Sequence, residues 1–213
     1  MHSNAYTYKF IIILTGIAAL LLSLASTGLK DKQDFNREID TKKNILKAVG
    51  IFDKKMKSTE VEDLFNKNIT EKFVTKEGVE TSDKTQLQVF IFGNGELPKG
   101  YILPISGKGL WSTVNGFLAL EPDLNTIKGI TFYEHGETPG LGGEIDKDWF
   151  TSNFKGKTIF EEGKLVSVKI AKGQLQKPNP HEVDGISGAT LTTQGLNEFI
   201  LEDLQKYINF LKG

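Results

Sequence analysis

The sequence predicts an α+β fold: one domain with a mixed or antiparallel sheet and flanking helices, preceded by one transmembrane helix. Short stretches with strand-like alternation are separated by glycine and proline, and they do not alternate regularly with helices. An amphipathic helical pattern closes the chain, and an uncharged apolar run lies near its start.

The apolar run covers residues 10–29 (FIIILTGIAALLLSLASTGL) and contains no charged side chain. As a helix it would extend about 30 Å, which matches the hydrocarbon thickness of a bilayer. A cleaved signal peptide is the alternative, because residues 24–26 (LAS) lie near a small-residue cleavage site. The run is long for a signal peptide and only Lys9 precedes it as a basic residue, so we favour a retained anchor.

The anchor is expected to tether the chain and not to conduct ions, because ion pathways through membranes need charged or ionisable side chains. Its orientation stays open at this point. Counting basic residues favours a cytoplasmic domain, but large domains translocate against that bias. The basic residues that follow the run are Lys30, Lys32, Arg37, Lys42 and Lys43.

The remaining elements divide the chain into a short tail (1–9), the anchor (10–29), a helical stalk or packing segment (30–75) and a folded domain (76–213). A second helix is expected near residues 58–65. Strands are expected at 86–92, 101–105, 117–120, 127–133 and 165–170. In the closing helix, Leu196, Phe199, Ile200 and Leu204 form an apolar stripe, and Thr192 or Thr193 is a plausible N-cap.

Composition excludes several kinds of chemistry. The 213 residues are 38% hydrophobic and 25% charged with a net charge of −1, and no basic stripe indicates nucleic acid as a partner. The absence of cysteine excludes disulfides, thiolate catalysis and cysteine-ligated clusters. Nucleophile-elbow and P-loop motifs are absent too. His135 and Glu137 would share a strand face but lack a third ligand, so we expect no metal site.

The most informative motif is DGISGAT at residues 184–190. It is similar to the flavinylation motif Asp-x-x-(Ser/Thr)-Gly-Ala-Thr, in which the last threonine hydroxyl forms a phosphoester bond to FMN. Thr190 lies just before the closing helix, whose N-terminus favours an anionic group. The alternative is an ordinary glycine turn with a threonine cap.

Two further glycine-rich clusters lie at residues 104–112 and 135–143. Glycines let the backbone approach a flat ring or a phosphate closely. Trp111 and Leu141 are candidates to cover an isoalloxazine ring, although core packing explains either residue equally well. Lys172 could meet the flavin phosphate or ring, or it could be a solvated lysine.

Longer strings carry a family resemblance over nearly the whole chain. With the anchor and these strings, the chain resembles the family of C subunits of the sodium-translocating NADH:quinone reductase. The related G subunit of the Rnf electron-transfer complex shares two of the short motifs, but not the strings at 43–46 and 107–112. The strings lie at residues 34–36, 42–46, 107–112, 132–144 and 184–190.

The resemblance implies an FMN-binding domain on the periplasmic side of a bacterial inner membrane, held by a single-pass helix. One FMN would be attached to Thr190 by a separate flavin transferase that uses FAD and Mg²⁺. Ser187 and Gly188 would position the phosphate, and Trp111 would lie close to the ring. The ring pocket would be shaped by Glu137, Thr138, Leu141 and Gly142, while Asp184 and Ala189 complete the motif.

The resemblance also implies the place of this chain in a larger machine. Electrons would arrive from an iron–sulfur centre and leave to the FMN of the B subunit, both held by partner subunits. The whole translocase would couple NADH oxidation and ubiquinone reduction to sodium export. This chain alone would hold no complete active site and no catalytic residue.

Two alternatives differ from this interpretation. A G-type subunit of the Rnf complex would also carry flavin but would have other partners. A cofactor-free, membrane-anchored extracytoplasmic binding module would use residues 187–190 only as a helix-capping turn.

Overall fold

The computed structural model describes residues 4–95 and 97–213, and the chain divides into two compact units, one up to Asp40 and one from Thr41 to Gly213. Helix α1 (Asn4–Ala48) provides the described part of the first unit, and its last residues belong to the second. The predicted helix at 10–29 is confirmed as part of α1. Its apolar side chains are exposed, and among the described helices only α1 is long and apolar enough to cross a membrane.

The second unit is built around a six-stranded sheet with the order β2-β1-β3-β4-β5-β6, in which all neighbours are antiparallel. Its strands are β1 (Ile69–Val74), β2 (Glu80–Thr81), β3 (Leu87–Phe92), β4 (Gly100–Lys108), β5 (Thr113–Leu120) and β6 (Ile127–Glu134). Two small sheets pair β7 (Phe160–Glu161) with β8 (Lys164–Leu165) and β9 (Lys169–Ile170) with β10 (Glu182–Val183).

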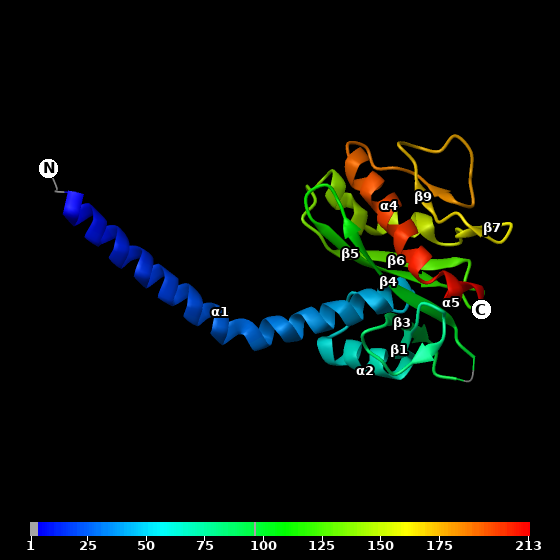
Figure 1. Ribbon diagram of the computed structural model, residues 1–213, viewed down its shortest axis with the longest axis horizontal. Coiled ribbons are helices and arrows are strands. Elements are labelled where there is room, and N and C mark those ends of the chain that lie inside the picture. The colour runs from blue at the N-terminus through cyan, green and yellow to red at the C-terminus, as the bar shows by residue number, and fades with distance from the viewer. Residues whose placement is uncertain (1–3, 96) are drawn as a thin grey trace. The chain divides into compact units, whose positions relative to one another are not determined.

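One face of the large sheet is covered by α4 (Thr190–Lys206), which is followed by α5 (Ile208–Lys212) (Figure 1). The main hydrophobic core lies between them, because the buried residues of α4 and of alternate sheet positions belong to one cluster. Three short helical segments border this core: η1 (Gly142–Asp146), α3 (Asp148–Thr151) and η2 (Ser152–Phe154). The predicted apolar stripe of the closing helix is confirmed, since Leu196, Ile200 and Leu204 are fully buried.

The opposite face of the sheet packs against the end of α1 and against α2 (Ser58–Asn68). The Phe65 ring of α2 meets the Phe90 ring edge-on at 6.4 Å, and Phe90 meets Phe117 at 6.0 Å. Near the end of α1, the Thr131 hydroxyl donates a hydrogen bond to the Asn44 carbonyl at 3.3 Å. The sheet therefore separates α2 from α4.

Two predicted elements differ from the structure. The helical segment predicted over 30–75 is wrong for its last residues, because β1 pairs along its whole length with β3. The strand predicted over 165–170 is two separate strands, β8 and β9. Between them Ser167 has a φ of 64°, a left-handed conformation that ends an extended run.

Candidate cofactor site

Thr190 is the first residue of α4, and its side chain is exposed. Ala189, which precedes it, is buried. The prediction of an N-cap at Thr192 or Thr193 is wrong, because both lie inside the first helical turn. Their hydroxyls are engaged there: Thr192 Oγ1 donates to Glu137 Oε2 at 2.6 Å, and Thr193 Oγ1 donates to the Ala189 carbonyl at 3.1 Å. Thr190 is exposed, and within the described chain its hydroxyl makes no hydrogen bond.

The three glycine-rich clusters meet at the start of α4. Gly188 has a φ of 75°, and a Cβ there would lie 2.7 Å from Leu141 Cδ2. A Cβ at Gly142 would lie 2.9 Å from Glu137 Oε2, and one at Gly109 would lie 2.6 Å from Glu137 Oε1. A side chain at any of these three glycines would force the neighbouring Leu141 or Glu137 side chain to move. Residues from 104–112, 135–143 and 187–190 therefore form one site.

Glu137 occupies the centre of this site and is only 5% exposed. Its Oε1 accepts the Trp111 backbone N–H at 2.9 Å, and its Oε2 accepts the Thr192 hydroxyl. Burial by itself would raise the pKa of Glu137. The hydrogen bonds from the Thr192 hydroxyl and from the backbone N–H groups of residues 110–112 outweigh burial and hold the pKa below its ordinary value. Glu137 is therefore a carboxylate at neutral pH.

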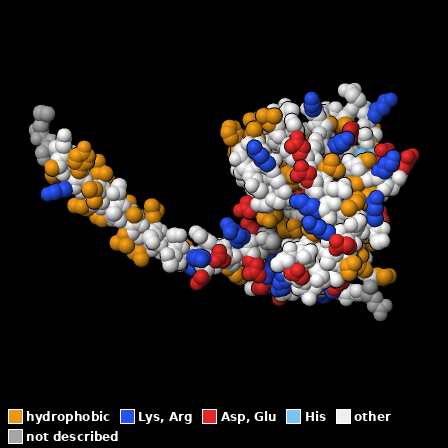
Figure 2. All heavy atoms as spheres, in the orientation of Figure 1, with side chains coloured by type: hydrophobic (Ala, Val, Ile, Leu, Met, Phe, Trp, Pro, Cys, Tyr) orange, Lys and Arg blue, Asp and Glu red, His pale blue; other side chains and the backbone are white. Residues whose placement is uncertain are grey.

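Apolar side chains are exposed around the same site. Trp111 is 70% exposed and Leu141 is 44% exposed, and Leu110 and Leu191 are exposed as well. Core packing, the alternative explanation for Trp111 and Leu141, therefore does not apply. Figure 2 shows hydrophobic side chains gathered on the domain surface near the start of α4. Exposed aromatic and aliphatic side chains of this kind suit a flat apolar ligand.

A cavity of about 460 Å³ lies beside Thr190. Lys169 and Lys172 line it from β9 and the segment after it, and Gln194 and Asn197 line it from α4. Asn197 joins the two walls, because its side chain accepts the Ile170 N–H at 2.7 Å and donates to the Ile170 carbonyl at 3.0 Å. Among the described residues no ion pair is recorded for either lysine, so both charges are available to an anion.

Other predicted site residues lie differently. Asp184 Oδ1 accepts the Leu175 N–H at 2.7 Å, which fixes the loop before β10. Asp184 lines another cavity and not the one beside Thr190. Thr138 is exposed, and its carbonyl accepts N–H groups from Leu141 and Gly143 at 3.1 and 2.8 Å, closing a turn. Ser187 is exposed in the turn just before the helix.

Sequence reasoning missed Lys169, Gln194 and Asn197 as lining residues and missed the bond between Thr192 and Glu137. Gln194 and Asn197 lie four and seven residues after Thr190, which places them on the same helical face, and this spacing was the available signal. Lys169 lies on a strand of two residues, too short to show any pattern.

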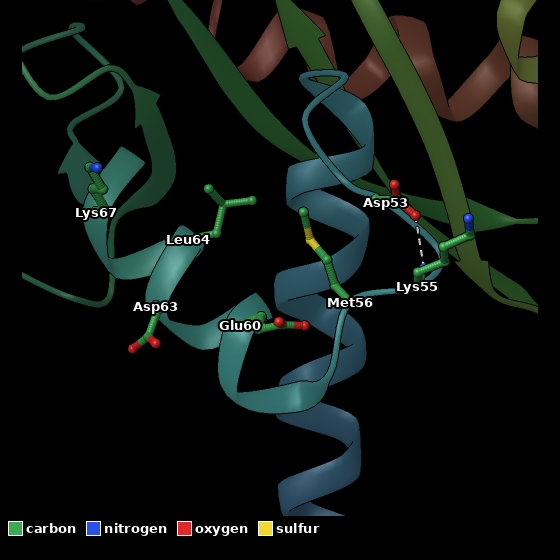
Figure 3. A pocket seen from close by; sticks show the side chains of 7 residues that line it. All are labelled: Asp53, Lys55, Met56, Glu60, Asp63, Leu64 and Lys67. Carbon is green, nitrogen blue, oxygen red and sulfur yellow. Dashed lines mark hydrogen bonds between the residues drawn. The ribbon is translucent and has the colours of Figure 1, made fainter.

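A second cavity of about 550 Å³ lies against α2, on the sheet face opposite α4. Figure 3 shows the apolar side chains of Met56 and Leu64 there, with charged side chains around them and the Asp53 carboxylate bonded to the Lys55 N–H at 2.8 Å. Because the sheet lies between this cavity and Thr190, it is not part of the candidate cofactor site.

The site and the fold define an FMN-binding domain: the family model of that description matches residues 109–205, which include the convergent residues from Gly109 to Thr192. Curated relatives cover most of the chain. The C subunit of Na(+)-translocating NADH-quinone reductase from Yersinia pestis is 32% identical over 89% of this chain and 84% of its own. The protein of the same name from Vibrio vulnificus (strain YJ016) is 33% identical over 96% and 94%. The chain belongs to this family of C subunits.

Solved structures agree with this assignment. The crystal structure of the C subunit of Na(+)-translocating NADH-quinone reductase from Parabacteroides distasonis is 34% identical, with a TM-score of 0.78 over 87% of this chain and 98% of that chain. Shewanella oneidensis NqrC is 28% identical, with a TM-score of 0.71 over 83% and 99%. The predicted α+β fold is thereby confirmed.

Proposed function

We propose that this chain is a membrane-anchored electron carrier of the sodium-translocating NADH:quinone reductase, with one FMN joined to Thr190 by a phosphoester bond. The observation that carries the proposal is the state of the Thr190 hydroxyl. It is the exposed one of the three threonine hydroxyls in the first turn of α4, and it ends the motif at residues 184–190.

The surroundings of Thr190 fit both ends of FMN. The phosphate carries negative charge, and Lys169, Lys172 and the N-terminus of a 17-residue helix provide positive potential beside the hydroxyl. The isoalloxazine ring is flat and largely apolar, and Trp111 and Leu141 expose apolar surface near the same turn. Gly188 leaves the room that Leu141 needs.

Attachment requires a separate flavin transferase with FAD as donor and Mg²⁺. The Thr190 hydroxyl loses its proton and forms an O–P bond to the phosphorus of the FMN half, while the P–O–P bond breaks and AMP leaves. Bound FMN supplies the ability to accept and release electrons. The chain itself holds the cofactor so that it cannot dissociate between transfers.

The partners follow from the family. Electrons are expected from an iron–sulfur centre of one partner subunit and pass to the FMN of the B subunit, within a complex that couples NADH oxidation and quinone reduction to sodium export. The names of the relatives favour this complex over the Rnf type. Residues 10–29 would anchor the chain in the bacterial inner membrane, with the domain on the periplasmic side.

The experiment compares Thr190→Ala with Thr70→Ala, a matched removal of an exposed threonine hydroxyl on β1, outside the candidate site. Each variant is produced in the whole complex together with the flavin transferase. Thr190→Ala is expected to abolish in-gel flavin fluorescence of this chain and NADH-driven quinone reduction, whereas Thr70→Ala keeps both. Flavin fluorescence that persists in Thr190→Ala would refute the attachment site.

A further inference from the structure

We propose that Glu137 is a positioning residue of the flavin site: one carboxylate fixes both the segment that carries Trp111 and the rotation of α4 that turns Thr190 outward. The effect of this role on flavin attachment at Thr190 rests on the proposed function. The sequence resemblance implied instead that Glu137 lines the ring pocket.

Both carboxylate oxygens of Glu137 already accept hydrogen bonds inside the protein. Oε1 accepts the Trp111 N–H at 2.9 Å, and Oε2 accepts the Thr192 hydroxyl at 2.6 Å. With 5% of the residue exposed, little of Glu137 is left to touch a cofactor. Its hydrogen bonds join the segment before β5 to the first turn of α4.

Two glycines, Gly109 and Gly142, leave room for the Glu137 carboxylate. A Cβ at Gly109 would lie 2.6 Å from Oε1, and a Cβ at Gly142 would lie 2.9 Å from Oε2. Any side chain at either position would displace the carboxylate from its two partners. The glycines of two clusters are thus spatially matched to a single carboxylate.

Glu137 acts on Thr190 through Thr192, which lies in the same turn of α4. Successive residues of an α-helix are turned by about 100°, so Thr190 and Thr192 point about 200° apart around the helix axis. The bond from Thr192 to Glu137 directs the Thr192 side chain into the protein and therefore directs Thr190 to the opposite side, into solvent. It also occupies the Thr192 hydroxyl, which leaves Thr190 as the acceptor for the transferase.

The experiment uses the full chain and four variants. Glu137→Gln keeps the size but cannot accept two hydrogen bonds through two oxygens. Thr192→Val removes only the hydroxyl, and Thr192→Ser restores it. Glu202→Gln is the matched control, because Glu202 is an exposed carboxylate of the same helix for which no partner is recorded in the described chain.

Two readouts are measured. The first is the initial rate of FMN transfer from FAD by the purified transferase. The second, on flavin-free protein, is amide hydrogen exchange at Trp111. We expect Glu137→Gln and Thr192→Val each to slow transfer about tenfold, and Glu137→Gln to speed exchange of the Trp111 amide about tenfold, the effect of losing roughly 1.4 kcal/mol. Thr192→Ser and Glu202→Gln are expected to match the wild type in both readouts.

The outcomes separate the two proposals. If Thr190→Ala blocks labelling while Glu137→Gln and Thr192→Val label at the wild-type rate, the positioning role is refuted and the attachment site stands. If the wild type is never labelled, the attachment site fails, and amide exchange at Trp111 still decides whether Glu137 holds that segment. Should Glu137→Gln not fold, the pair Thr192→Val and Thr192→Ser decides the positioning role through the transfer rate.

Discussion

Thr190, Thr192 and Thr193 share one helical turn, yet their hydroxyls have different surroundings. The hydroxyls of Thr192 and Thr193 are buried and donate hydrogen bonds to Glu137 and to the Ala189 carbonyl. The Thr190 hydroxyl faces solvent. A motif in the sequence identifies Thr190 by spacing alone. Accessibility provides an independent physical reason for choosing the same residue.

Side-chain roles in the site were only partly predictable from the sequence. The motif and the glycine clusters predicted which segments matter, because glycine and a terminal hydroxyl have local conformational requirements. Which partner Glu137 binds depends on residues 26 and 55 positions away in the chain, and no local pattern encodes that choice. The hydrogen bond from the Leu175 N–H to Asp184 could not be predicted for the same reason.

Gly188 has a left-handed backbone conformation in the turn before α4, which a substitution can test. Gly188→Ala is expected to lower the free energy of unfolding by about 1–2 kcal/mol, because a left-handed φ penalises Cβ and Leu141 occupies its space. Urea unfolding of the purified chain measures the change. Gly173→Ala is the matched control, since Gly173 has no heavy atom within 4 Å of its Cβ position and should change stability by about 0.5 kcal/mol or less. Equal effects at both glycines would contradict the role given to Gly188.

The Glu137 carboxylate predicts an acid-dependent stability. Because the folded pKa lies below the ordinary value, its contribution is complete above the unfolded pKa of about 4.3 and is lost as pH falls through the folded pKa. Glu137→Gln should therefore be less stable than wild type at pH 7, and the difference should shrink below pH of about 4. Urea midpoints across this pH range give the measurement, and a difference independent of pH would contradict the assignment.

At the scale of elements, α4 depends on close contact with the end of β4. The Gly195 Cβ position overlaps the Lys108 carbonyl oxygen and lies 3.4 Å from Gly109 Cα. Helix propensity alone favours alanine over glycine inside a helix by about 1 kcal/mol. At Gly195 the close contact outweighs helix propensity, because the methyl group of alanine would push the helix away from the sheet.

Gly195→Ala is accordingly expected to destabilise the domain by about 1–3 kcal/mol, as overpacking does, instead of stabilising it. Glu202→Ala, at an exposed position of the same helix, should change the free energy of unfolding by about 0.5 kcal/mol or less. Thermal or urea unfolding distinguishes the two. A stabilised Gly195→Ala variant would show that α4 does not pack this closely on β4.

Elements with a clear periodicity were the ones that the sequence predicted. Strands β3 to β6 have apolar runs or alternation long enough to show their period, and α4 has a complete apolar stripe. Strand β1 reads ITEKFV, in which polar residues at both faces conceal the alternation. The strands β7 to β10 have two residues each, too short to show a period: β7 and β8 pair in a tight local hairpin, and β9 and β10 pair across the loop between them.

At the scale of the whole molecule, the sequence predicted an apolar helix at 10–29 and a folded domain at 76–213, whereas the structure divides the chain at residues 40 and 41, inside α1. The side of the membrane was not predictable from charge, because the basic residues after residue 29 favour the cytoplasm while we propose that the domain lies on the periplasmic side. Topology therefore needs its own experiment.

Reporter fusions after Gly213 test the topology. We expect alkaline phosphatase to be active and a green fluorescent protein to stay dark, since the first requires export and the second fails to mature outside the cytoplasm after standard export. The same fusions to a chain without residues 10–29 are the control and should show the reverse. A fluorescent full-length fusion with inactive phosphatase would place the domain in the cytoplasm.

The central claim is that this chain is a one-cofactor carrier whose attachment point is the Thr190 hydroxyl. Intact-mass spectrometry of the chain produced with the flavin transferase, followed by peptide mapping, tests it most directly. We predict a mass gain of one FMN minus one water, located on Thr190. An unmodified, colourless protein under these conditions, or FMN mapped to another residue, would contradict the claim.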